Sequence, residues 1–112
     1  MIKNEEGGSK MSLKKQFLKS KPICKVTFYL SKDAVAQAKK VHLVGDFNEW
    51  NTNATPMKKQ KDGGYSITLN LEQGREYQFR YLLDDSIWEN DWCADKYVPS
   101  SVGDADNSVV VL

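Results

Sequence analysis

Alternation of apolar and polar residues constrains the fold of this chain more than any other sequence feature. In residues 65–71 and 77–83 every second side chain is apolar. A period of two places successive side chains on opposite faces of a strand, so each segment predicts a strand with one buried face. Residues 24–30 repeat the alternation. Shorter apolar runs typical of further strands follow at residues 41–44, 87–88 and 109–112.

The connections between the predicted strands are short. Residues 72–75 have the length of a hairpin loop and include Gly74, so residues 64–83 are predicted to form an antiparallel hairpin. Residues 31–40 contain three alanines, but a connection of this length suits a loop with one helical turn at most. About six short strands without a long helical period predict an all-β fold, either a sandwich or a small barrel.

The length of 112 residues fits a single domain. We expect the β domain to span residues 22–112, and residues 1–21 to form an N-terminal extension that is flexible or forms a short helix. Ser12 suits the N-cap of such a helix. Met11 is an alternative start, so the natural origin of Met1–Lys10 stays open.

Composition argues against several classes of function. A net charge of +1, with 40% hydrophobic and 28% charged residues, is typical of a soluble globular protein. Near-neutral charge, with an acidic segment after Leu82, argues against binding to nucleic acid. No apolar run approaches the roughly 18 residues of a membrane span, and the N-terminus lacks the apolar stretch of a secretory signal. We therefore expect no membrane association and a cytoplasmic location.

Residues suited to catalysis or metal binding are scarce. Cys24 and Cys93 lie far apart and are expected to be free thiols, and His42 is the only histidine, which leaves no zinc ligand set. The sequence contains neither a nucleophile elbow nor a phosphate loop. Its carboxylates Asp84, Asp85, Glu89 and Asp91 fall in a predicted turn region, where we expect them to be solvated. We expect no enzymatic activity, no cofactor and no metal site.

The tryptophans are the residues that most suggest a binding function. Trp50, Trp88 and Trp92 all fall in predicted loops or short strand ends. A half-exposed indole offers a flat apolar face, and a sugar ring has one face of C–H groups that can stack on it, while its hydroxyls need fixed polar partners. Each tryptophan could instead pack under a loop, and Trp92 is the one for which we favour packing.

The segment Val41–Asn51, with the sequence VHLVGDFNEWN, resembles the hallmark of the family 48 carbohydrate-binding modules, the immunoglobulin-like early-set domains of isoamylases and branching enzymes. The glycogen-binding domain of the AMP-activated protein kinase β subunit is similar. The resemblance runs from about Val26 to Leu112 and includes residues 74–83, Trp88 and residues 103–110. It implies an immunoglobulin-like β-sandwich.

The resemblance also implies a ligand platform of two tryptophans, one basic residue and one polar residue on the last loop. In this sequence the matching positions are Trp50, Trp88, Arg80 and Asn107. The register leaves Asp106 as an alternative to Asn107, and Ser101 and Val102 compete for a clamping position. Gly45, Phe47 and Asn48 are expected to be structural: the glycine for a sharp exit from the strand, the phenylalanine as a core residue, and the asparagine as a tie to the loop backbone.

Two functions follow as hypotheses. The first is a non-catalytic module that binds an α-glucan, such as glycogen, starch or a maltooligosaccharide, related to the accessory domain of family 13 glycoside hydrolases. The chain is too short for the catalytic barrel of about 250 residues that such modules accompany. The alternative is an interaction or regulatory module that has lost sugar binding and packs on a partner enzyme or forms a weak homodimer. The residues expected to form that contact are Leu13, Phe17, Trp92 and Tyr97.

Overall fold

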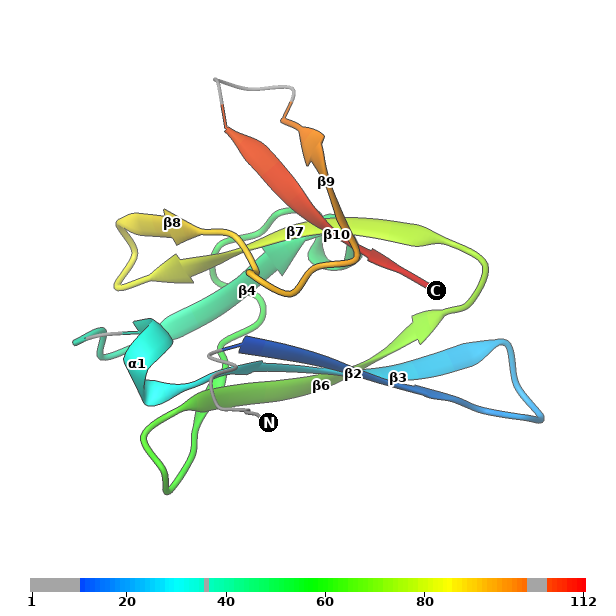
Figure 1. The fold of residues 1–112 in the computed structure, drawn as a ribbon, viewed down its shortest axis with the longest axis horizontal. Coiled ribbons are helices and arrows are strands. Elements are labelled where there is room, and N and C mark those ends of the chain that lie inside the picture. Colours follow the sequence, from blue (N-terminus) through cyan, green and yellow to red (C-terminus); the bar gives the residue numbers. More distant parts are fainter. Residues whose placement is uncertain (1–10, 36, 101–104) are drawn as a thin grey trace, which may run out of the picture.

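The fold is a sandwich of two antiparallel sheets, which confirms the all-β prediction (Figure 1). The computed structural model describes residues 11–35, 37–100 and 105–112. The four-stranded sheet has the order β2-β3-β6-β5, with strands β2 (Met11–Phe17), β3 (Ile23–Leu30), β6 (Tyr65–Glu72) and β5 (Lys58–Lys59). The five-stranded sheet has the order β4-β7-β10-β9, with β8 also paired to β7. Its strands are β4 (Val41–Gly45), β7 (Glu76–Leu83), β10 (Asp106–Val111), β9 (Lys96–Pro99) and β8 (Ile87–Glu89).

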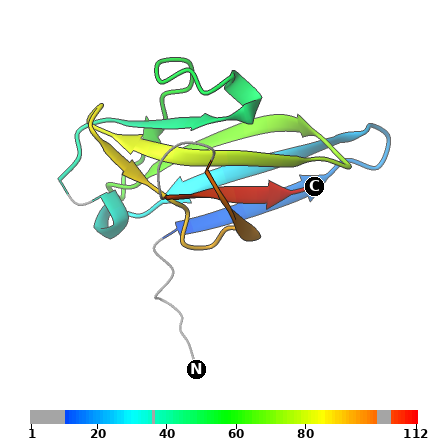
Figure 2. The same ribbon diagram turned by 90° about the horizontal axis from the view of Figure 1, so that it is seen from above.

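The apolar positions of the alternating segments form the core between the sheets. In Figure 2 the five-stranded sheet lies in front of the four-stranded one. Phe28 of β3 meets Phe79 of β7 edge to face, with ring centroids 5.2 Å apart, and Phe79 meets Tyr81 in the same way at 5.7 Å. All three side chains are fully buried. Alternation therefore identified the inward face of each of these strands correctly.

The expected N-terminal helix is wrong. Residues 11–17 form β2, which pairs with β3 from Met11 opposite Leu30 to Phe17 opposite Cys24. Met11 is 1% exposed and belongs to the core, and Leu13 packs against that core. A strand forms because the exposed edge of β3 supplies hydrogen-bond partners for a whole strand, whereas an isolated helix of this length is only marginal.

The predicted hairpin over residues 64–83 is also wrong. β6 and β7 lie in different sheets, and residues 72–75 carry the chain across the sandwich between them. The crossing is held at both sides, because the Gln73 amide donates to the Pro22 carbonyl and the Gly74 amide donates to the Leu112 carbonyl. Gly74 has a φ of 77°, which suits glycine. Alternation defines which face of a strand is buried but leaves its hydrogen-bonding partner undetermined.

The remaining connections largely match the predictions. Residues 31–40 contain a single helical turn, α1 (Lys32–Val35), and Asp84 and Asp85 form the turn between β7 and β8. β5 and β9 were not predicted, because both are short and their exposed side chains show no apolar alternation. Among the described residues, no helix is long and apolar enough to span a membrane.

Candidate functional site

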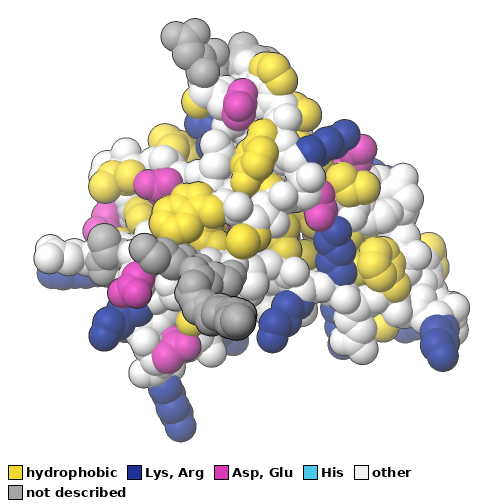
Figure 3. All heavy atoms as spheres, viewed as in Figure 1, with side chains coloured by type: hydrophobic (Ala, Val, Ile, Leu, Met, Phe, Trp, Pro, Cys, Tyr) yellow, Lys and Arg dark blue, Asp and Glu magenta, His cyan; other side chains and the backbone are white. Residues whose placement is uncertain are grey.

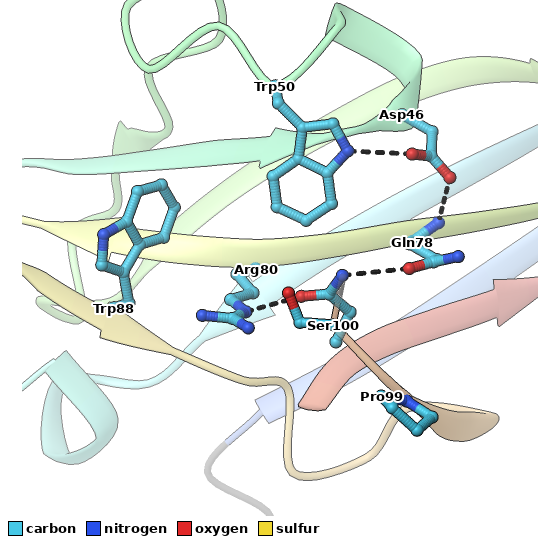
Figure 4. Close-up of a pocket in the computed structure, with 8 residues that line it drawn as sticks. Asp46, Trp50, Gln78, Arg80, Trp88, Pro99 and Ser100 are labelled. Atoms are coloured by element: carbon cyan, nitrogen blue, oxygen red, sulfur yellow. Dashed lines mark hydrogen bonds between the residues drawn. The ribbon is translucent and has the colours of Figure 1, made fainter. Parts of the chain in front are cut away.

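A groove on the outer face of the five-stranded sheet contains all four residues that the sequence singled out (Figure 4). Its volume is about 630 Å³. Trp50 comes from the loop after β4, Arg80 from β7, Trp88 from β8 and Asn107 from β10. Four separate segments of the chain therefore meet at one surface.

β7 runs through the middle of this groove and determines which side chains reach it. Tyr77, Phe79 and Tyr81 are buried in the core, so the alternate residues Gln78 and Arg80 point outward. Their cross-strand neighbours on the same face are apolar and buried, although they lie outside the core cluster and do not line the groove. These neighbours are Val44, opposite Arg80; Val109, opposite Gln78; and Leu82, opposite Trp88.

The loop after β4 holds Trp50 in an unusual backbone conformation. The 3₁₀ helix η1 (Asp46–Asn48) follows the strand directly, and both Glu49 (φ 57°) and Trp50 (φ 58°) are left-handed. Such residues cost about 1–3 kcal/mol each and persist only where their surroundings fix them. The Trp50 amide donates to the Gly45 carbonyl at 2.8 Å, which closes the loop.

Two of the three residues that were predicted to be structural in this loop, Asn48 and Phe47, have the predicted roles. The Asn48 side chain accepts from the Gly45 amide at 3.0 Å and donates to the Leu43 carbonyl and the Thr55 hydroxyl, both at 2.9 Å. Phe47 packs against the core, with its ring centroid 5.8 Å from that of Phe28.

Gly45 is required for a different reason from the one predicted. Its backbone is extended, a conformation open to any residue. A Cβ at this position would lie 2.4 Å from the Gln78 carbonyl oxygen and 2.7 Å from the Phe79 Cβ. The glycine therefore allows β4 to approach β7 closely, and it provides no special turn geometry.

Asp46 orients the Trp50 indole, a role that the sequence analysis missed. One carboxylate oxygen accepts from the indole Nε1–H at 2.9 Å, and the other accepts from the Gln78 amide at 2.8 Å (Figure 4). The indole N–H is thus occupied by the protein, and the ring offers its face to a ligand. The available signal was the spacing of four residues between Asp46 and Trp50 within the hallmark segment.

Asn107 fixes Arg80. Its side-chain oxygen accepts from Arg80 Nε at 2.7 Å, and its amide nitrogen donates to Gln78 Oε1 at 3.0 Å. Asn107 is 7% exposed and lines the groove, whereas its alternative Asp106 is exposed and does not line it. Among the described residues, no hydrogen bond is made by the terminal nitrogens of Arg80, so its planar fork remains available as a donor.

Trp88 lies at the other end of the groove and is 43% exposed. It is carried by the β7–β8 hairpin, whose turn contains Asp84 (φ 51°) and Asp85 (φ 62°). Asp84 accepts from the amides of Lys39 and Lys40, and the Lys40 ammonium pairs with Asp85 at 2.5 Å. The hydrogen bond from Lys40 lowers the pKa of Asp85 below its ordinary value.

Further residues line the groove, and other predicted residues lie outside it. Gln78, Pro99 and Ser100 were not identified from the sequence, although Gln78 shares the outward face of β7 with Arg80. Ser101 and Val102 lie outside the described residues. The predicted interaction residues Phe17, Trp92 and Tyr97 are exposed and do not line the groove, so the packing favoured for Trp92 is wrong. Figure 3 shows several hydrophobic side chains across the middle of the face that Figure 1 presents.

The chemistry of the groove is that of a site for a neutral polar ligand with apolar faces. Its main features are two half-exposed indoles together with amide and guanidinium donors that are fixed by hydrogen bonds. In the described part of the chain, no group of His, Cys, Asp and Glu residues is arranged to hold a metal ion. This combination matches sugar rings, which present C–H faces and hydroxyl rims.

Comparison with known protein families agrees with this reading of the groove. The model of carbohydrate-binding module 48, the isoamylase N-terminal domain, matches residues 35–98. A search of curated proteins gave no match. The matched range includes Trp50, Arg80 and Trp88 and ends before Asn107, and the immunoglobulin-like sandwich predicted from the resemblance is confirmed. Because the match spans more than half of the 112 residues, the chain belongs to the carbohydrate-binding module 48 family.

Proposed function

We propose that this chain binds α-glucans, such as glycogen, starch or maltooligosaccharides, without cleaving them. The observation that carries the proposal is the meeting of Trp50, Arg80, Trp88 and Asn107 in one groove, although they come from four separate segments. The family's description as an isoamylase N-terminal domain supports an accessory role in glucan metabolism, in association with a family 13 glycoside hydrolase.

Each groove residue has a distinct role in this proposal. Trp50 and Trp88 stack on glucose rings, and the terminal nitrogens of Arg80 donate to sugar hydroxyls. Asn107 holds Arg80 in place and has one amide hydrogen left for a hydroxyl, since Gln78 takes the other.

The expected affinity is modest. Burial of about 100 Å² of apolar surface at each of two stacked rings corresponds to roughly 5 kcal/mol at ~25 cal/mol per Å². Immobilisation of the ligand and of Arg80 offsets part of this gain, so we expect dissociation constants between micromolar and millimolar.

Native gel electrophoresis in the presence of glycogen tests the proposal. Glycogen should retard the wild-type protein, and retardation should be strongly reduced in Trp50→Ala and in Trp88→Ala. Trp92→Ala is a matched control, because Trp92 is 51% exposed and lies outside the groove. If the wild type migrates alike with and without glycogen, or if all three variants behave alike, the proposed sugar site does not exist.

A further inference from the structure

A second groove, of about 370 Å³, lies on the opposite face of the sandwich. It is formed by the outward side chains of the four-stranded sheet and by the turn between β5 and β6. Tyr29 of β3 occupies its middle, opposite Ser12 of β2 on one side and Ser66 of β6 on the other. The inward-pointing neighbours Phe28 and Leu30 are buried in the core, so Tyr29 faces away from the first groove.

The Tyr29 ring is held in place by the β5–β6 turn. Its hydroxyl donates to Asp62 at 2.8 Å, and the other oxygen of Asp62 accepts from the Gly64 amide at 2.8 Å. A Cβ on Gly64 would lie 2.8 Å from the Tyr29 hydroxyl oxygen and 3.0 Å from its Cε1 atom. The ring therefore lies against the Gly64 backbone, in a space that only glycine leaves open.

Charge fixes the direction of the hydrogen bond between Tyr29 and Asp62. The hydrogen bond to Asp62 raises the pKa of the Tyr29 phenol, and the hydrogen bond from the Gly64 backbone lowers the pKa of Asp62. At neutral pH the phenol is the donor and the carboxylate the acceptor, which keeps the ring oriented.

Unpaired polar groups surround this ring. Among the described residues, the hydroxyls of Ser12 and Ser66 and the ammonium of Lys14 have no hydrogen-bond partner. Lys14 lies opposite Thr27, whose hydroxyl is hydrogen-bonded to that of Thr68 at 2.8 Å. A fixed aromatic ring beside free hydroxyl and ammonium donors is the combination that recognises a sugar ring.

We propose that this second groove is an additional saccharide-binding site, with Tyr29 as the stacking platform and Ser12, Ser66 and Lys14 as hydroxyl partners. The identity of its ligand as an α-glucan rests on the proposed function of the first groove. Because the two grooves lie on the outer faces of different sheets, one molecule bridges two glucan segments. On a polymer, the two sites act together and raise the apparent affinity above that of either site alone.

Titration of the ¹⁵N-labelled chain with maltoheptaose, followed by NMR, separates the two sites. We expect two groups of amide shift changes, one around Gln78 and Asn107 and the other around Ser12, Thr27 and Ser66. Changes in the first group alone overturn the second site and leave the proposed function standing. Changes in the second group alone overturn the first site, and changes in neither group overturn both.

Variants test the second groove directly. Tyr29→Ala should abolish the second group of shift changes and retain the first, and Lys14→Ala, at an exposed position that tolerates truncation, should weaken the second group only. Lys25→Ala is the matched control, because Lys25 is exposed on the same face of β3 but does not line the groove. Equal shift changes in Lys14→Ala, Lys25→Ala and the wild type would contradict the role assigned to Lys14.

The linking of two glucan segments by one protein molecule can also be measured by light scattering. The wild type should increase the light scattering of dissolved glycogen by linking its particles, and Tyr29→Ala should bind glycogen without increasing its scattering. If Tyr29→Ala increases the light scattering of glycogen as much as the wild type does, the second groove does not link glycogen particles.

Discussion

At the scale of single residues, the groove depends on side chains that hold other side chains. Asp46 occupies the N–H of Trp50, and Asn107 occupies Nε of Arg80, so the two candidate contacts are oriented before a ligand arrives. A side chain held in this way loses less conformational freedom when it binds. Under the proposed function, the orienting residues should contribute to affinity even where they do not touch the sugar.

Replacement of Asp46 tests this orienting role. Asp46→Ala removes the acceptor for the Trp50 N–H and for the Gln78 amide. We expect affinity for maltoheptaose to fall about tenfold, which corresponds to ~1.4 kcal/mol, with an upfield shift of the Trp50 indole proton in NMR. Asp46→Asn, which keeps one acceptor oxygen, should lose less affinity. Asp33→Ala, at an exposed carboxylate on α1, is the control. Unchanged affinity and an unchanged indole resonance in Asp46→Ala would contradict the role.

The sequence predicted the candidate ligand contacts of this groove, but not the residues that hold those contacts in place. Trp50 and Trp88 stand out because large aromatic residues in loops are unusual, whereas Arg80 and Asn107 were identified through the family resemblance. Asp46 and Gln78 did not stand out, since a carboxylate in a turn and an amide in a strand are common. Their significance comes from distances that join separate segments, which a linear pattern does not contain.

Among the strands, β2 and the crossing at residues 72–75 show that apolar periodicity does not determine which sheet a strand joins. The alternation of β6 and β7 identified their buried faces, but a strand buries the same face whichever sheet it joins. In β2 the inward residues Met11 and Leu13 alternate correctly, yet Lys15 breaks the apolar pattern. Lys15 reaches across the edge of the sandwich to Asp95 at 2.7 Å and to the Val111 carbonyl at 3.1 Å, so a polar residue at an inward position still joins the sheets.

If β2 is an integral strand, its inward residue must contribute to stability. Met11 is 1% exposed, and Met11→Ala should lower the free energy of unfolding by about 2–5 kcal/mol, measured by urea denaturation. Lys19→Ala, at an exposed position after the strand, should leave stability within about 0.5 kcal/mol of the wild type. Equal midpoints for the two variants would mean that residues 11–17 are an appendage to the domain.

The loop between β8 and β9 is fixed by Asp91, which is buried, so the prediction that this carboxylate is solvated is wrong. Asp91 accepts from the Tyr81 hydroxyl at 2.6 Å and from the Cys93 amide at 2.7 Å, and its own amide donates to Ser108. Burial raises the pKa of Asp91 above its ordinary value, although these hydrogen bonds oppose the change. The burial of Asp91 therefore disfavours the charged form of its carboxyl group.

This raised pKa predicts the sign of a pH dependence. The contribution of Asp91 to stability is greatest below the pKa of an unfolded Asp and declines as pH rises through its pKa in the folded protein. Asp91→Asn has no carboxyl group to titrate at this position. The free energy of unfolding of the variant minus that of the wild type should therefore increase from acid to neutral pH. Urea denaturation at a series of pH values measures the difference. A constant or decreasing difference would contradict the raised pKa.

At the scale of the whole molecule, ligand binding and folding are linked. The groove on the five-stranded sheet is assembled from four segments that come together only in the folded chain, so a ligand of this groove binds the native state and not the unfolded one. Any such ligand must raise the free energy of unfolding, by an amount set by its concentration and its dissociation constant.

This linkage predicts that maltoheptaose stabilises the protein, by at least ~2.7 kcal/mol when its concentration is one hundred times the dissociation constant. Urea denaturation with and without the sugar measures the gain, and cellohexaose, a β-linked glucan, serves as the control ligand. The double variant Trp50→Ala and Trp88→Ala should lose the gain from the first groove, because both stacking platforms are absent. Its stability without sugar should change little, since Trp50 is half-buried and Trp88 is 43% exposed, and both lie outside the core cluster. An equal gain in the double variant and the wild type would mean that the glucan binds elsewhere on the molecule.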